Sequence, residues 1–236
     1  MANEVLLLAG TAAAIGFGHT LLGPDHYLPF IVLSGARRWS RAKTALVTLF
    51  CGLGHILSSV ALGFAGIALG VAVFRLEAIE SARGQIAGWL LIAFGLAYFV
   101  WGLHRALRGR AHEHAHPHED GTIHSHEHRH LGGHFHVHAA PGQNLTPWVL
   151  FTIFVFGPCE PLIPLVMYPA ARHNIASVVV VVSVFGLTTL FTMLAIVLAS
   201  VHGLRRVPVH RLERYSHAMA GLAILLCGAA IRFLGL

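Results

Sequence analysis

The chain has 236 residues, of which 56% are hydrophobic and only 11% are charged, and its mean hydropathy is +0.68. Soluble domains carry about 25% charged residues, so this composition excludes an ordinary soluble domain and predicts an integral membrane protein. The formal net charge of +6 comes from lysines and arginines that lie between apolar segments. That placement indicates membrane topology rather than a nucleic-acid-binding surface.

Six apolar segments are long enough to cross a bilayer, which takes about 20 residues each. They are residues 4–35, 44–74, 86–103, 146–170, 175–200 and 217–236. The sequence therefore predicts an all-α membrane protein with six transmembrane helices. Glycine and proline interrupt two of these segments, and we expect broken helices at 18–29 and 156–164. Such breaks persist at membrane depth only where protein or a wet cavity completes the backbone hydrogen bonds.

Basic residues are concentrated on one side of the predicted bundle. Four follow each of the first, third and fifth spans, which makes 12 of the 16 lysines and arginines. By the positive-inside rule these connections are cytoplasmic, and both termini lie outside the cytoplasm. We expect a multi-pass protein of a bacterial-type cell membrane.

The two halves of the chain share dipeptides at one spacing of 134 residues. The pairs are Gly23-Pro24 with Gly157-Pro158, and Gly52-Leu53 with Gly186-Leu187. Three spans per half is an odd number, so a second copy must enter the membrane in the opposite orientation, as in many transporters. The predicted organisation is a first three-helix repeat at 1–103, a cytoplasmic loop at 104–144 and a second three-helix repeat at 145–236.

The loop between the repeats carries eleven histidines, many at alternating positions. They are His112, His114, His116, His118, His124, His126, His128, His130, His134, His136 and His138. The tract lacks apolar periodicity, and we expect it to be disordered without a ligand. Neutral imidazole is a common ligand for nickel, copper, zinc and cobalt, which favours transient metal capture by this loop. The alternative is a solubilising, pH-sensitive linker.

The first predicted break carries His19, Asp25 and His26 within an apolar run. Insertion scales put an aspartate at the centre of a membrane helix at roughly +2.5 to +3.5 kcal/mol, so Asp25 needs a partner, a cation or a wet path. The Gly-Pro dipeptide between the two histidines permits a bend that brings them together. His55 follows small residues on the second span, which allow close helix approach. These four side chains are a candidate metal site, although one histidine alone could instead hydrogen-bond between helices.

The second predicted break places Cys159 and Glu160 at the positions equivalent to Asp25 and His26. Glu160 is also costly in lipid, and we expect it to contact a cavity or a cation. Cys159 has three open roles, as a soft metal ligand, a redox thiol or a packing residue.

These residues resemble the nickel/cobalt transporter group of the lysine-exporter-type superfamily, particularly its UreH-like urease-accessory transmembrane branch. The resemblance rests on His19 with Asp25-His26, on Leu53-Gly54-His55 and on the histidine-rich loop. Nickel permeases carry a His-x4-Asp-His signature, whereas five residues separate His19 from Asp25 here. The Gly157-Pro158-Cys159 corner is similar to the Pro-Cys corners of thiol-electron carriers related to DsbD and CcdA. Those carriers use one cysteine in each repeat, and Asp25 stands where the first would be.

The leading hypothesis is a secondary transporter of divalent transition-metal ions, nickel or cobalt, with zinc as a further candidate, and not an enzyme. The expected partners are this metal ion and the lipid bilayer, and no nucleic acid is expected. The sequence does not decide whether the chain forms an oligomer. The expected midplane ligands are His19, Asp25, His26, His55, Cys159 and Glu160. One alternative is a transmembrane thiol–disulfide electron carrier, in which Cys51 or Cys227 would partner Cys159. Another is a membrane factor that delivers metal to urease or hydrogenase without transporting it.

Overall fold

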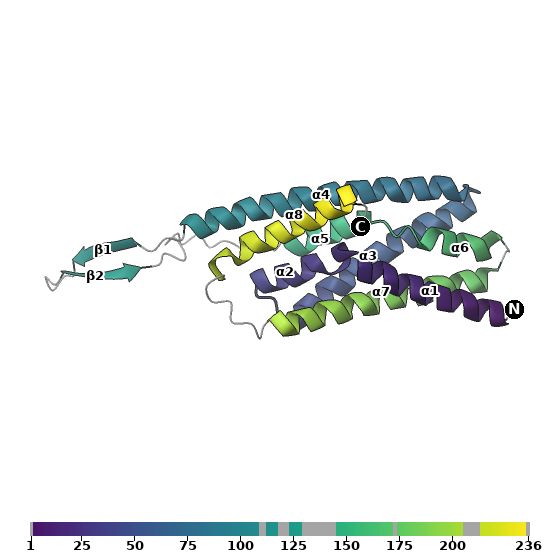
Figure 1. Ribbon diagram of the computed structural model, residues 1–236, viewed down its shortest axis with the longest axis horizontal. Helices are drawn as coiled ribbons and strands as arrows, with labels where there is room; N and C mark the ends of the chain where they lie inside the picture. Colours follow the sequence, from purple (N-terminus) through teal and green to yellow (C-terminus); the bar gives the residue numbers. More distant parts are fainter. Residues whose placement is uncertain are drawn as a thin grey trace.

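The structure is a computed structural model that describes residues 2–108, 145–171, 174–204 and 213–234, together with the backbone of two short strands. Within this part of the chain, five helices are long and apolar enough to cross a membrane. They are α1 (Ala2–Leu22), α3 (Arg41–Ala68), α4 (Val73–Arg108), α7 (Ile175–Leu204) and α8 (Ser216–Leu234). They lie alongside one another in an elongated bundle (Figure 1). The protein is an all-α membrane protein, as the sequence predicts.

Both predicted helix breaks are present. The first apolar segment consists of α1, a 3₁₀ turn η1 (Pro24–His26) and α2 (Leu28–Ala36). The fourth consists of two short helices, α5 (Thr146–Phe156) and α6 (Leu162–Ala171). Each break begins at a Gly-Pro dipeptide, because proline lacks the backbone N–H that would continue the helix.

Helix α4 is much longer than the predicted third span, 86–103. Its 36 residues extend over about 54 Å at the usual rise per residue, more than a bilayer core requires. The prediction ended the span at charged residues on both sides, but charged residues do not end a helix. The helix therefore includes Glu80 and Arg83, and it also takes in the first residues of the segment assigned to the loop.

Part of the histidine-rich loop forms an antiparallel pair of strands, β1 (His112–Pro117) and β2 (Ile123–His128), which follow α4 (Figure 1). In their register each histidine of β1 lies opposite a histidine of β2. Regular structure here differs from the expected disorder, and the alternating sequence matches the two-residue period of a strand. The remaining histidines of the tract lie outside the described residues; they are His118, His130, His134, His136 and His138.

The helices pack mostly against helices of the other half. Helix α4 runs antiparallel to α8, because Gly95 packs on the backbone at Leu225 whereas Gly102, seven residues later, packs on Ala218. A side chain at either glycine would collide with the α8 backbone, so these small residues let the two helices approach closely.

The middle helices of the two halves are also antiparallel. Gly52 of α3 faces Met193 of α7, and Gly186 of α7 faces Ile56 of α3. Equivalent helices of the two halves therefore run in opposite directions, which is the inverted arrangement that the repeat predicts.

The buried apolar residues form two clusters. One contains Phe30, Leu33 and Phe154, and the other contains Cys159 and Phe185. Histidines lie beside both clusters, with the ring centroid of His19 6.4 Å from that of Phe185 and the ring centroid of His55 6.3 Å from that of Phe154.

Candidate metal-binding site

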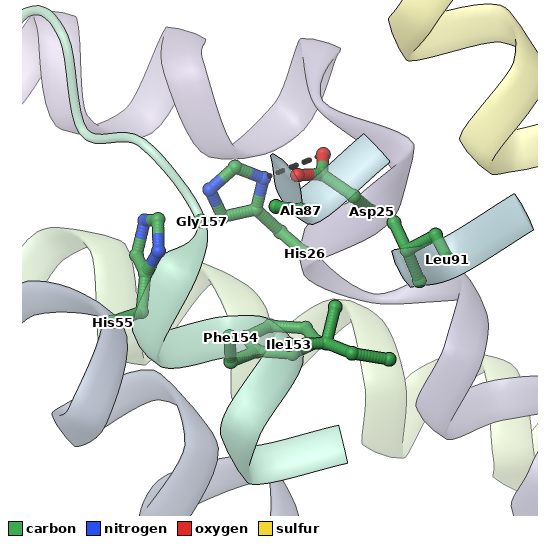
Figure 2. A pocket seen from close by; sticks show the side chains of 8 residues that line it. All are labelled: Asp25, His26, His55, Ala87, Leu91, Ile153, Phe154 and Gly157. Atoms are coloured by element: carbon green, nitrogen blue, oxygen red, sulfur yellow. Dashed lines mark hydrogen bonds and ion pairs between the residues drawn. The ribbon is translucent and has the colours of Figure 1, made fainter. Parts of the chain in front are cut away.

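His19, His26 and His55 come together inside the bundle from three different elements, α1, η1 and α3, and are called here the three-histidine site. Each offers one nitrogen, and these atoms lie within 4.8 Å of one another. The ring centroids of His19 and His26 are 4.7 Å apart, and those of His26 and His55 are 5.0 Å apart. His26 and His55 are buried, and Figure 2 shows their rings side by side. The structure thus brings together three of the six side chains proposed as ligands.

The first helix break makes this approach possible. In a continuous helix His19 and His26 would be about 10 Å apart along the axis, whereas the break folds His26 back beside His19. Gly23 at the break has no room for a side chain, since a Cβ there would lie 2.5 Å from Nδ1 of His26 and 2.9 Å from Oδ1 of Asp25. Any side chain at position 23 would therefore force His26 and Asp25 to shift.

The contacts of His26 determine which ring nitrogen carries its proton. Its Nδ1 lies 3.1 Å from Oδ1 of Asp25 and 3.1 Å from the carbonyl oxygen of Gly23. Both oxygens accept hydrogen bonds, so Nδ1 is the donor and Nε2 of the neutral ring carries the lone pair. A carboxylate that orients a histidine in this way is the usual support of a metal ligand. Asp25 thus lies behind a ligand rather than in the group of three.

The His55 ring lies beside the end of α5, and its Nε2 has no hydrogen-bond partner among the described residues. A Cβ at Gly157 would lie 2.9 Å from Nδ1, so the second break also holds a glycine against a histidine of the site.

The Nε2 atoms of all three histidines are buried and have no hydrogen-bond partner in the part of the chain that the structure describes. Leaving one buried polar atom unsatisfied costs about 1–3 kcal/mol, so three in one place need an explanation. A single water molecule can donate only two hydrogen bonds, whereas a transition-metal cation accepts several imidazole lone pairs at once. The adjoining cavity of about 20 Å³, lined by Asp25, His26 and His55, has space for one small ion or water (Figure 2).

Cys159 and Glu160 do not join this group. Cys159 is buried in the cluster around Phe185, and its backbone N–H donates to Oε2 of Glu80 at 3.0 Å. Glu160 is exposed and lies outside the group of three histidines, so its contact with an ion stays a prediction. Both breaks contain backbone hydrogen bonds between residues three apart, from the N–H of His26 to Gly23 in the first and from the N–H of Leu162 to Cys159 in the second. Even so, sequence equivalence does not give equivalent side-chain directions.

Sequence reasoning missed two residues of this region, Glu80 and Arg83. They form an ion pair inside the bundle, and Glu80 is fully buried. The predicted third span began after them, which left Arg83 in a connection. Their signal in the sequence is an acid and a base three residues apart, a spacing that places both on one side of a helix.

The comparison with protein families identifies the chain. A family model described as the transmembrane region of cytochrome c biogenesis proteins matches residues 28–230. The chain belongs to this family. The match supports the DsbD- and CcdA-like part of the resemblance, and no comparison supports the nickel/cobalt part. It begins just after His26, so it includes His55 and Cys159 but not the first break. Searches of the curated proteins and of the solved structures each gave no match.

Proposed function

We propose that this chain is a membrane carrier for a divalent transition-metal ion, which binds at the three-histidine site between the two inverted halves. The observation that carries the proposal is the convergence of three histidines, each of which has a buried Nε2 atom with no hydrogen-bond partner among the described residues. His26 already has the tautomer that a metal requires, because the Asp25 carboxylate and the Gly23 carbonyl hold its Nδ1 proton. Imidazole ligands suit nickel, cobalt and zinc, and the proposal names this class of ion.

The surrounding fold suits transport of a bound ion. Each half contributes a broken helix to the site, and the halves run in opposite directions across the bundle. In inverted-repeat transporters the substrate lies at the repeat interface, and one group of helices rocks against the other to expose it alternately. Protons compete with the metal for imidazole, so the ion is expected to bind less tightly as the pH falls.

Flux through the purified protein tests this proposal. In vesicles loaded with a metal-sensitive dye, His26→Ala and His55→Ala are each expected to lower nickel and cobalt flux at least about tenfold, since loss even of a supporting residue costs 10–100-fold at metal sites. His104→Ala is the matched control, because His104 is an exposed histidine on α4. Wild-type flux by either site variant would contradict the proposal. Metal binding without any flux would instead favour a metal-delivery factor.

A second candidate function is thiol–disulfide electron transfer across the membrane, and family membership favours it. This chemistry needs a thiolate that attacks the disulfide of a partner and a second thiol that resolves the mixed disulfide by forming a new disulfide within the carrier. All three cysteines, Cys51, Cys159 and Cys227, are buried free thiols in this structure. Cys51 and Cys159 belong to different apolar clusters. Nothing in this arrangement pairs two thiols, which is why the metal carrier is the leading proposal.

Cysteine variants separate the two candidates. A metal carrier is expected to retain full flux in Cys159→Ser, with Cys227→Ser as the control. An electron carrier would instead lose disulfide reduction in Cys159→Ser, and a mixed disulfide of Cys159 would be trapped from the wild-type protein.

A further inference from the structure

Glu80 and Arg83 lie against the second helix break, directly behind His55. We propose that this pair is a positioning device for the three-histidine site, which holds the end of α5 so that Nε2 of His55 faces the metal. The inference rests on the proposed function. Neither residue is a ligand in it, and both act through the backbone of the break.

The break leaves backbone groups that an unbroken helix would have paired. The last carbonyls of α5 and the first N–H groups before α6 have no partner within their own helices. Glu80 supplies an acceptor on one side, where its Oε2 receives the backbone N–H of Cys159 at 3.0 Å. Arg83 supplies donors on the other side, where Nη2 donates to the carbonyl oxygens of Val155 at 2.6 Å and Gly157 at 3.4 Å.

The signs of the two charges match the two helix ends. A helix carries partial positive charge at its N-terminus and partial negative charge at its C-terminus. The Glu80 carboxylate lies near the residues that lead into α6, and the Arg83 guanidinium lies at the end of α5. Exchanging the positions of these two charges would oppose both helix dipoles. The pair thus complements the two helix dipoles at the break and also supplies hydrogen-bond partners to its backbone.

Arg83 reaches His55 by two routes. Its Nη2 donates to the hydroxyl of Ser58 at 2.7 Å, and that hydroxyl donates to the backbone carbonyl of His55 at 2.8 Å. On the other route, Arg83 holds the carbonyls of Val155 and Gly157, and Gly157 packs so closely on the His55 ring that a Cβ there would lie 2.9 Å from Nδ1. One guanidinium therefore holds the backbone of His55 through Ser58 and the backbone segment that packs against its ring.

Simple stabilisation of the fold does not account well for this arrangement. Burying an ion pair costs several kcal/mol per ion before the attraction is counted, and apolar residues of similar size often do as well or better. A buried pair whose hydrogen bonds end on the backbone around a proposed ligand gives precise placement of that ligand. Glu80 also accepts from the Ser59 hydroxyl at 3.3 Å, which leaves α3, α4 and the break in one hydrogen-bonded unit.

The test uses Co²⁺ as the probe, because its visible absorption reports the number and geometry of its ligands. We compare purified full-length wild type with Arg83→Lys and Glu80→Gln for Co²⁺ affinity and for the position of the absorption bands. The controls are Arg75→Gln and Glu77→Gln, which change exposed charges on the same helix. We expect both variants of the pair to bind Co²⁺ about 10–100-fold more weakly with shifted bands, and both controls to match the wild type.

A double variant, Glu80→Gln/Arg83→Gln, keeps the inference testable if a single variant leaves an uncompensated buried charge and does not fold. Its neutral side chains retain hydrogen-bonding groups, and the same weaker affinity and shifted bands are expected. Wild-type affinity and bands in any folded variant of the pair would overturn the positioning role while leaving the metal site intact. A wild-type protein that binds no Co²⁺ would overturn the metal site and this inference together.

Discussion

At the scale of single residues, the distinction that matters is between side chains that bind and side chains that orient. His19, His26 and His55 come together, and their buried Nε2 atoms have no hydrogen-bond partners in the described structure. Asp25 contributes an oxygen to His26 from behind, at 3.1 Å. The aspartate that is so costly in an apolar segment is thus explained by its bond to a histidine.

Replacing Asp25 tests this orienting role. Asp25→Asn keeps an oxygen that can accept a hydrogen bond from Nδ1 of His26 but removes the negative charge. Asp25→Ala removes both the oxygen and the charge. We expect Co²⁺ affinity to fall about 10-fold or more in Asp25→Asn, and further in Asp25→Ala, because supporting residues of metal-bound histidines carry effects of this size. Titration of the purified protein with Co²⁺ measures this affinity. Glu160→Gln, an exposed carboxylate at the other break, is the control and is expected to bind as the wild type does.

Residue types and spacing allowed the group of three histidines to be predicted, but not the full ligand set. His19, His26 and His55 were identifiable because ionisable groups are rare and costly in apolar helices. Glu160 was assigned by its offset from His26, yet it is exposed and lies outside the group of three, because an offset in sequence does not fix the direction of a side chain. Glu80 and Arg83 were missed because hydropathy treats charged residues as the end of a span.

At the scale of elements, the two breaks were predictable from Gly-Pro dipeptides, yet they differ in how they are completed. The first contains a 3₁₀ turn that pairs its own backbone, with the N–H of His26 bonded to the carbonyl of Gly23. The second also pairs part of its own backbone, with the N–H of Leu162 bonded to the carbonyl of Cys159, but it takes further partners from Glu80 and Arg83 of another helix. Nothing in the local sequence of the second break indicates that a distant helix supplies these bonds.

Adding one methyl group at Gly23 is therefore expected to disturb the geometry of the first break. In Gly23→Ala the new Cβ would lie 2.5 Å from Nδ1 of His26 and 2.9 Å from Oδ1 of Asp25, so the turn must move. We expect loss of metal flux and a large drop in Co²⁺ affinity. Gly18→Ala is the matched control, because nothing lies within 4 Å of its Cβ and alanine favours a helix. Equal flux in the two variants would show that the geometry of the turn does not matter.

At the scale of the whole molecule, the two halves are held together by helices that meet at glycine. Along α4 and α8 the contacts recur at seven-residue steps, through Gly88, Gly95 and Gly102 on one helix and Gly221 and Gly228 on the other. This spacing keeps one small-residue seam facing the partner helix. The three histidines come from other elements, α1, η1 and α3, although Ala87 and Leu91 of α4 line the cavity beside them. The fold thus uses different residues to join the halves and to bind the ion, side by side.

The site is also separate in sequence from the histidine-rich loop, and this separation makes a prediction about the whole chain. The three proposed ligands precede residue 56, and Gly157, which packs against His55, follows residue 145. Replacing residues 112–138 by a flexible linker of equal length leaves this entire set in place. If the loop collects metal for the site, flux is expected to fall at low metal concentration and to reach the wild-type maximum at saturation, with unchanged Co²⁺ bands. A lowered maximum or shifted bands would instead make the loop part of the transport site, and unchanged flux at every concentration would support the linker alternative.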